Sequence, residues 1–163
     1  MFELDYRIVQ DENDEFVGQN GFFQIKCNGF TYGEVYSKEL EPVVDKVSVY
    51  NWFERLAKVI KCLMTNEYVA LSDVESYSTW IEFYRKDEEV VVSVVKAEKE
   101  DGSRDIEFSL KETSSGEWEK QVICYSQLRT EIIDKLKEYV DFLVTHNPKN
   151  PEIEKMDEIL KCI

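Results

Sequence analysis

Five strand-like segments joined by short polar turns occupy the middle of the sequence, and this pattern strictly limits the possible folds. Turns as short as residues 86–89 and 113–116 join neighbouring strands in antiparallel order, which predicts a meander. Along the second segment, Trp80 and Tyr84 face the side opposite to the one that Ile81 faces. Because both sides carry bulky side chains, we expect helices to cover one of them. The predicted strands span residues 68–71, 77–85, 90–97, 106–110 and 118–125.

A hairpin is predicted near the N-terminus. Apolar and polar side chains alternate from Phe2 to Ile8, as they do in a half-buried strand. A second strand covers residues 22–27, and a third begins directly after Asn28-Gly29. Both residues of this dipeptide tolerate the positive φ that a type I′ turn requires. We therefore expect three strands before the first helix.

Helical periodicity appears in three later places. Residues 49–64 place their apolar side chains on one stripe, and Ser48 precedes them as a capping residue. A longer stripe covers residues 127–145, and Asn150-Pro151 starts a last short helix. These patterns predict a single α+β domain over residues 1–163, with the element order βββα-βββββ-αα. We expect an antiparallel meander sheet with the three helices packed mainly on one side.

Acidic residues strongly outnumber basic ones. The 163 residues include 34 Asp and Glu against 20 Lys and Arg, a net charge of −14. Such a field repels nucleic acid and anionic lipids, so we expect neither as a partner, whereas it favours a basic protein. The first residues lack the basic and apolar stretches of a secretion signal, and the apolar runs are too short for a bilayer. We expect a cytoplasmic protein that is a monomer or a weak dimer.

The motifs of common enzymes are missing from the sequence. The single histidine, His146, ends the long predicted helix and has no metal-spaced partner. Gly-rich phosphate-binding motifs are absent. Residues 11–22 fail as a calcium loop because Phe16 and Phe22 stand where glycine and glutamate are required. The four cysteines are widely spaced, which predicts reduced thiols. We therefore expect a non-enzymatic protein with no cofactor and no metal.

Acidic turns next to aromatic strands favour a role in binding. Charge at turn tips with aromatic area nearby is how protein interfaces combine steering with buried anchors. Successive turns of a meander lie at opposite ends, so we expect a partner to engage one end or one face. The predicted partner-binding residues are Asp11, Glu12, Asp14, Glu15, Asp87, Glu88, Glu89, Trp80 and Tyr84.

The order of these features resembles the small acidic immunity proteins of bacterial polymorphic and contact-dependent toxin systems. The resemblance lies in Gly21-Phe22-Phe23-Gln24-Ile25 followed by Asn28-Gly29, in the helix with Trp52, Leu56 and Ile60, and in the aromatic strand over residues 78–83. It implies a cytoplasmic antitoxin that binds one cognate toxin domain, often a basic nuclease. Binding then blocks the active site of the toxin or an adjacent surface.

Two other classes of function stay open at the level of sequence. One is a small-molecule-binding or regulatory domain that holds Trp80, Tyr84 or Trp118 inside an apolar pocket. The other is an acid-dependent hydrolase, which needs two carboxylates that converge in a cleft with raised pKa values.

Overall fold

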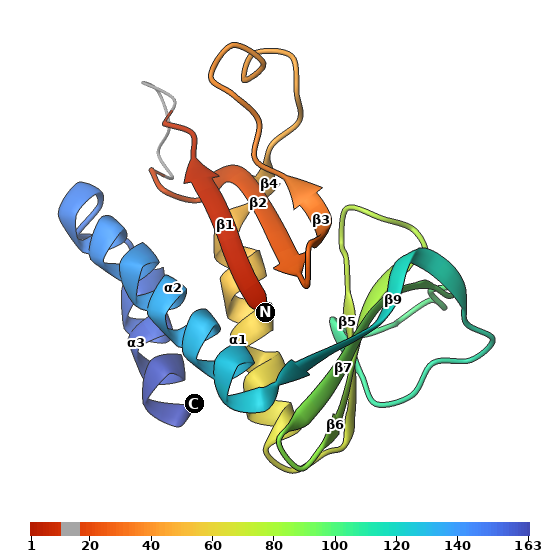
Figure 1. Cartoon of the computed structure of the whole chain (residues 1–163). Coiled ribbons are helices and arrows are strands. Elements are labelled where there is room, and N and C mark those ends of the chain that lie inside the picture. Colours follow the sequence, from red (N-terminus) through yellow and green to blue (C-terminus); the bar gives the residue numbers. More distant parts are fainter. Residues whose placement is uncertain (11–16) are drawn as a thin grey trace.

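The computed structural model describes residues 1–10 and 17–163 as an α+β fold (Figure 1). The structure confirms the predicted α+β class and, apart from one additional two-residue strand before the first helix, the predicted element order. The first sheet contains β1 (Phe2–Ile8), β2 (Asn20–Cys27), β3 (Phe30–Glu34) and β4 (Val47–Ser48). The second sheet contains β5 (Tyr68–Ser72), β6 (Thr79–Lys86), β7 (Glu89–Lys96), β8 (Ile106–Glu107) and β9 (Ser114–Cys124). The helices are α1 (Val49–Leu63), α2 (Tyr125–His146) and α3 (Glu152–Cys162).

The strands differ from the prediction in that they divide between two sheets instead of forming one meander. The first sheet has the order β1-β2-β3, with β4 on the end of β2. The second has the order β8-β5-β6-β7-β9, so only β5, β6 and β7 follow one another as a meander. The N-terminal hairpin is as predicted: Asn28 and Gly29 have φ values of 49° and 90°, and they join β2 to β3.

Two predicted boundaries in the second sheet are wrong. Residues 113–116 were expected to form a turn, but β9 already begins at Ser114. Gly116 permits this because a Cβ there would lie 2.1 Å from the carbonyl oxygen of Val94, at a register shift between β7 and β9. The predicted strand over residues 106–110 is reduced to the two residues of β8.

The helices form from the predicted stripes and gather on one side of the molecule (Figure 1). The Oγ of Ser48 accepts a hydrogen bond of 3.2 Å from the backbone N–H of Asn51, which confirms the predicted cap of α1. Helix α1 packs against β2 and β5, and α2 packs against β1 and β9. Helix α3 packs on α1 and α2, where Met156 is its one fully buried residue.

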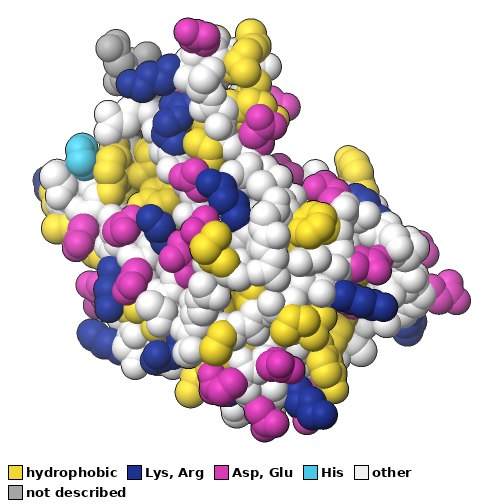
Figure 2. All heavy atoms as spheres, viewed as in Figure 1, with side chains coloured by type: hydrophobic (Ala, Val, Ile, Leu, Met, Phe, Trp, Pro, Cys, Tyr) yellow, Lys and Arg dark blue, Asp and Glu magenta, His cyan; other side chains and the backbone are white. Residues whose placement is uncertain are grey.

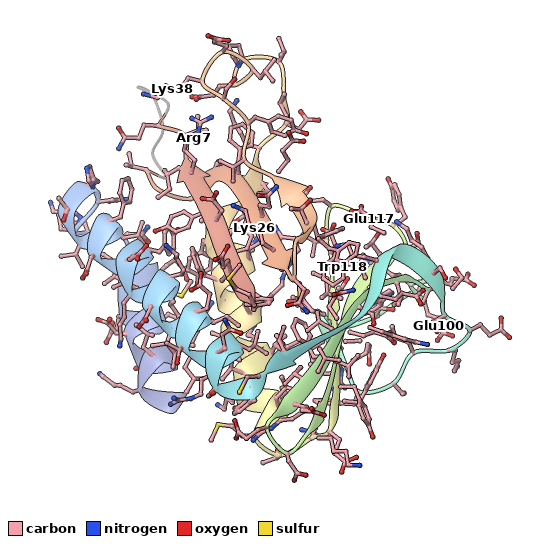
Figure 3. The ribbon with its side chains drawn as sticks, in the orientation of Figure 1. Arg7, Lys26, Lys38, Glu100, Glu117 and Trp118 are labelled. Atoms are coloured by element: carbon pink, nitrogen blue, oxygen red, sulfur yellow. The ribbon has the colours of Figure 1, made fainter. Side chains whose placement is uncertain are left out.

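Side-chain hydrogen bonds join the two sheets where no backbone ladder does. The indole N–H of Trp118 in β9 donates to the carbonyl of Thr31 in β3 over 2.9 Å. The Asn28 amide donates to the carbonyl of Val122 over 3.1 Å, and the Tyr32 hydroxyl donates to the buried Asp73 carboxylate. Figure 3 shows Trp118 and Glu117 on β9 beside the tip of the β2–β3 hairpin. One continuous hydrophobic cluster contains residues of both sheets and all three helices.

Candidate protein-binding face

The second sheet has an inner face on the main core and an outer face that points away from it. Ile81 and Phe83 of β6 are buried in the main core, which confirms the predicted alternation. On the outer face, four side chains lie in one row across β5, β6, β7 and β9. We call this row the open patch; it consists of Tyr68, Tyr84, Val91 and Val122. Tyr84 and Val122 are 46% and 51% exposed.

The other half of the outer face is covered by the chain that follows β7. Trp80 is 1% exposed and forms a small second cluster with Ala70, Val95 and Ala97, against which Leu110 packs. Its indole N–H donates to the carbonyl of Ala97 over 3.3 Å. The prediction that Trp80 contacts a partner is therefore wrong, because residues 97–113 cover the ring that the strand pattern exposes.

The β6–β7 turn lies beside the open patch, and the side chain of Arg85 holds its backbone in place. The guanidinium of Arg85 donates to the carbonyl of Asp87 over 2.8 Å and to the carbonyl of Leu63 over 2.9 Å. It also stacks on the ring of Tyr125 at 3.4 Å. Asp87 itself has a φ of 55°, which aspartate tolerates in a tight turn. The turn therefore presents the predicted residues Asp87, Glu88 and Glu89 on a fixed backbone.

Carboxylates border the open patch on two sides. Glu89 lies opposite Lys86 in the ladder and follows the same face as Val91. Glu82 accepts a hydrogen bond of 2.6 Å from the Tyr68 hydroxyl. Burial and this carboxylate raise the pKa of Tyr68 above its ordinary value, so its proton stays in place at neutral pH. The patch thus combines apolar area with a charged border, which contains the carboxylates of Glu82 and Glu89 and the ammonium group of Lys86.

Figure 2 shows hydrophobic side chains in small separate groups, with acidic and basic side chains interspersed around them. The lower right of that view corresponds to the region of β7 and β9 in Figure 1, and several of these hydrophobic groups lie there. Charge of one sign does not cover the visible face uniformly. A partner that recognises this surface must therefore match local charges as well as the net charge of the chain.

Asp11, Glu12, Asp14 and Glu15 lie outside the described residues. The acidic stretch over residues 98–101 lies at the opposite end of β7, as expected for a meander. Figure 3 places Glu100 at the far edge of the molecule, where it pairs with the exposed Lys111 over 3.3 Å.

Sequence reasoning missed three members of the open patch: Tyr68, Val91 and Val122. Residues 68–71 and 90–92 are unbroken apolar runs, so the sequence does not show which of their side chains face outward. The register that aligns them with Tyr84 is a property of the folded sheet alone. Of the three aromatic residues considered for an apolar pocket, Trp80 and Trp118 belong to different hydrophobic clusters and Tyr84 is exposed.

Other candidate chemistry is sparse in the part of the chain that the structure describes. Within residues 1–10 and 17–163, no three His, Cys, Asp or Glu side chains are grouped closely enough to hold a metal ion. His146 stacks on Phe142 at the end of α2, with ring centroids 4.1 Å apart. Cys27, Cys62, Cys124 and Cys162 are free thiols. In the same described ranges, no helix combines the length and apolar character that a bilayer crossing requires.

Comparison of the chain with protein-family models, with curated proteins and with solved structures finds no match.

Proposed function

We propose that this chain is a non-enzymatic binding protein that engages a basic protein through the open patch and the β6–β7 turn. The single observation that carries the proposal is the open patch, in which Tyr84 and Val122 are exposed, with carboxylates at its border. Tyr84 offers the large, rigid contact area that is typical of binding hot spots. The rest of the row supplies apolar surface that excludes water from the contact.

Charge adds a kinetic argument to this geometry. A net charge of −14 attracts a basic partner over long range and accelerates the encounter. Glu88 and Glu89 stand at the exposed turn, where they meet the partner first. We expect them to govern the association rate and its dependence on salt, and we expect Tyr84 and Val122 to govern the dissociation rate.

We further propose that the partner is a bacterial toxin domain and that the chain is its cytoplasmic immunity protein. The support is the resemblance carried by residues 21–25, Asn28-Gly29 and the aromatic strand β6, together with the acidic charge. In this function the chain neutralises the toxin by direct binding and needs no catalytic group of its own.

The test is co-expression with the product of the gene immediately upstream. If that product is a basic toxin, co-expression restores growth and the purified proteins form a complex. We expect Tyr84→Ala and Val122→Lys each to weaken the complex by about tenfold or more, the effect of losing an interface anchor. The matched control is Tyr77→Ala, which removes a 98% exposed tyrosine outside the patch and leaves the affinity unchanged.

Two results would contradict the proposal at different levels. Equal affinity of Tyr84→Ala, Val122→Lys and Tyr77→Ala would show that the partner docks elsewhere. Failure to restore growth, with no complex formed by the wild-type chain, would remove the toxin as partner.

A further inference from the structure

A second recessed site lies on the helical side of the molecule, where α1, α2 and α3 meet. Its cavity has a volume of about 600 Å³, within the range of small-molecule sites. We call it the helix-end pocket; the lining residues that matter here are Tyr50, Asn51, Glu54, Tyr139, Glu152 and Lys155. None of them belongs to the open patch.

Two buried polar atoms in the helix-end pocket form no hydrogen bond with the described residues. Tyr50 is 7% exposed, and among the described residues its hydroxyl forms no hydrogen bond. Within the same ranges, the Oε2 atom of Glu152 is also buried without one. Burial raises the pKa of Tyr50 to about 12, so the hydroxyl remains a donor at neutral pH. Buried polar groups are nearly always hydrogen-bonded, so the Tyr50 hydroxyl, which has no such bond and lines a cavity, points to a ligand.

Charged side chains of both signs line the helix-end pocket, with Glu54 and Glu152 on one side of the balance and Lys149 and Lys155 on the other. The Glu54 carboxylate forms ion pairs with the ammonium groups of Lys155, over 3.0 Å, and Lys58, over 3.2 Å. The Lys155 Nζ also forms an ion pair with the Oε2 of Glu152 over 3.6 Å and lies 5.5 Å from the centre of the Tyr50 ring. A primary ammonium group therefore already rests against two carboxylates and an aromatic face.

An anion does not fit this end of α3. The backbone N–H of Glu152 donates to the Oδ1 of Asn150 over 2.9 Å, so the first donor of the helix is occupied. Glu152 and Glu154 place two negative charges in its first turn. Those carboxylates repel phosphate or a ligand carboxylate.

We propose that the helix-end pocket binds a small aliphatic amine, whose ammonium group takes the place of the half-exposed Lys155 ammonium between Glu54 and Glu152. The Lys155 side chain, 52% exposed, swings into solvent when the ligand enters. The ligand ammonium then donates to the Glu152 Oε2 and lies on the Tyr50 ring. This site is separate from the proposed partner-binding face and stands without it.

The experiment is calorimetric titration of the full chain with putrescine and spermidine in 150 mM salt, which is on the order of physiological ionic strength. We expect saturable binding at one site per chain. The diol of the same length, 1,4-butanediol, and inorganic phosphate are the matched probes, and neither should bind. Absence of saturable binding by both amines would overturn the proposal.

Variants separate a built site from general attraction to an acidic protein. Glu152→Gln should weaken amine binding by about tenfold, the loss of one charge-assisted hydrogen bond. Glu158→Gln removes the same charge from α3 outside the helix-end pocket and should leave binding nearly unchanged. Lys155→Met should strengthen binding because it removes the competing ammonium, a result that does not depend on the Glu152 variant folding well. Equal weakening by Glu152→Gln and Glu158→Gln, or weaker binding to Lys155→Met, would overturn the proposal.

Discussion

Trp80 and Tyr84 lie four residues apart on the same strand and the same face of the sheet, yet Trp80 is buried in a hydrophobic cluster and Tyr84 is exposed at the surface. Trp80 is 1% exposed, and Tyr84 is 46% exposed. Residues 97–113 cross the sheet above Trp80 and leave the end near the β6–β7 turn uncovered. Strand alternation therefore decides which face an aromatic ring occupies, and a distant segment decides whether that ring is available for binding.

Polar contacts of Lys99 hold residues 97–113 in place over Trp80. The Lys99 ammonium donates to the carbonyl of Ser76 over 2.6 Å and to the carbonyl of Asp73. It also lies 5.3 Å from the centre of the Trp80 ring. Among the described residues, no comparable segment covers the half of the outer face that contains the open patch. The Tyr68–Glu82 hydrogen bond of that half joins two neighbouring strands of the sheet itself.

The largest expected effect is the loss of Trp80. Trp80→Ala removes a fully buried ring and leaves a cavity beneath residues 97–113, so the free energy of unfolding should fall by about 3–5 kcal/mol. Urea denaturation followed by circular dichroism measures this change. A loss below about 1 kcal/mol, as for a surface position, would mean that the two halves do not differ in the way described.

The next largest effect concerns the hydrogen bond between Tyr32 and Asp73, which joins the two sheets. Tyr32→Phe removes the hydroxyl that donates to Asp73, and the carboxylate, which is 7% exposed, loses a partner. We expect a loss of about 1–3 kcal/mol in the free energy of unfolding. Tyr77→Phe removes a hydroxyl at a fully solvated position and is the control. Equal stability of the two variants would show that Asp73 needs no support from β3.

An alkaline titration tests the hydrogen bond within the open half. The pKa of Tyr68 is raised from its ordinary value near 10 by burial and by Glu82, so the folded chain keeps a proton that the unfolded chain releases. Stability is therefore intact below pH 10 and falls as the pH rises above it. Tyr68→Phe should make this decline shallower, as measured by urea denaturation at a series of pH values. The partly buried Tyr6 and the buried Tyr50, whose pKa values are raised to about 12, account for part of the decline that remains. An unchanged slope in Tyr68→Phe would contradict the assignment.

The smallest expected effect on stability is that of replacing Tyr84, the exposed member of the Trp80–Tyr84 comparison. Tyr84→Ala should change the free energy of unfolding by no more than about 0.5 kcal/mol, since water already reaches much of the side chain. The same denaturation experiment measures it beside Trp80→Ala. A loss that approaches that of Trp80→Ala would make Tyr84 a structural residue and would weaken its assignment to a binding face.

Much of the local structure could be predicted from the residues themselves. The Asn28-Gly29 turn, the Ser48 cap and the apolar stripe of α2 all depend on neighbours in the chain, and the structure contains each of them. The strand conformation of residues 114–116 could not be predicted, because Ser-Ser-Gly is typical of a turn. It is the closeness of Val94 that makes Gly116 part of a strand.

The candidate binding face divides in the same way. Tyr84 and the turn over residues 87–89 follow from charge and alternation in the sequence. The inclusion of Val91 and Val122 depends on the register of β7 against β6 and β9. The exclusion of Trp80 depends on Leu110 and its neighbours, thirty positions further along the chain.

By itself the sequence determined the types and order of the elements, the hairpin and the acidic character of the surface, because periodicity, turn chemistry and charge act over a few residues. The tertiary structure alone decided the division into two sheets, the cover over Trp80 and the cavity between the three helices. Those features arise where segments far apart in the chain compete to bury the same apolar surface, and only packing in three dimensions settles that competition.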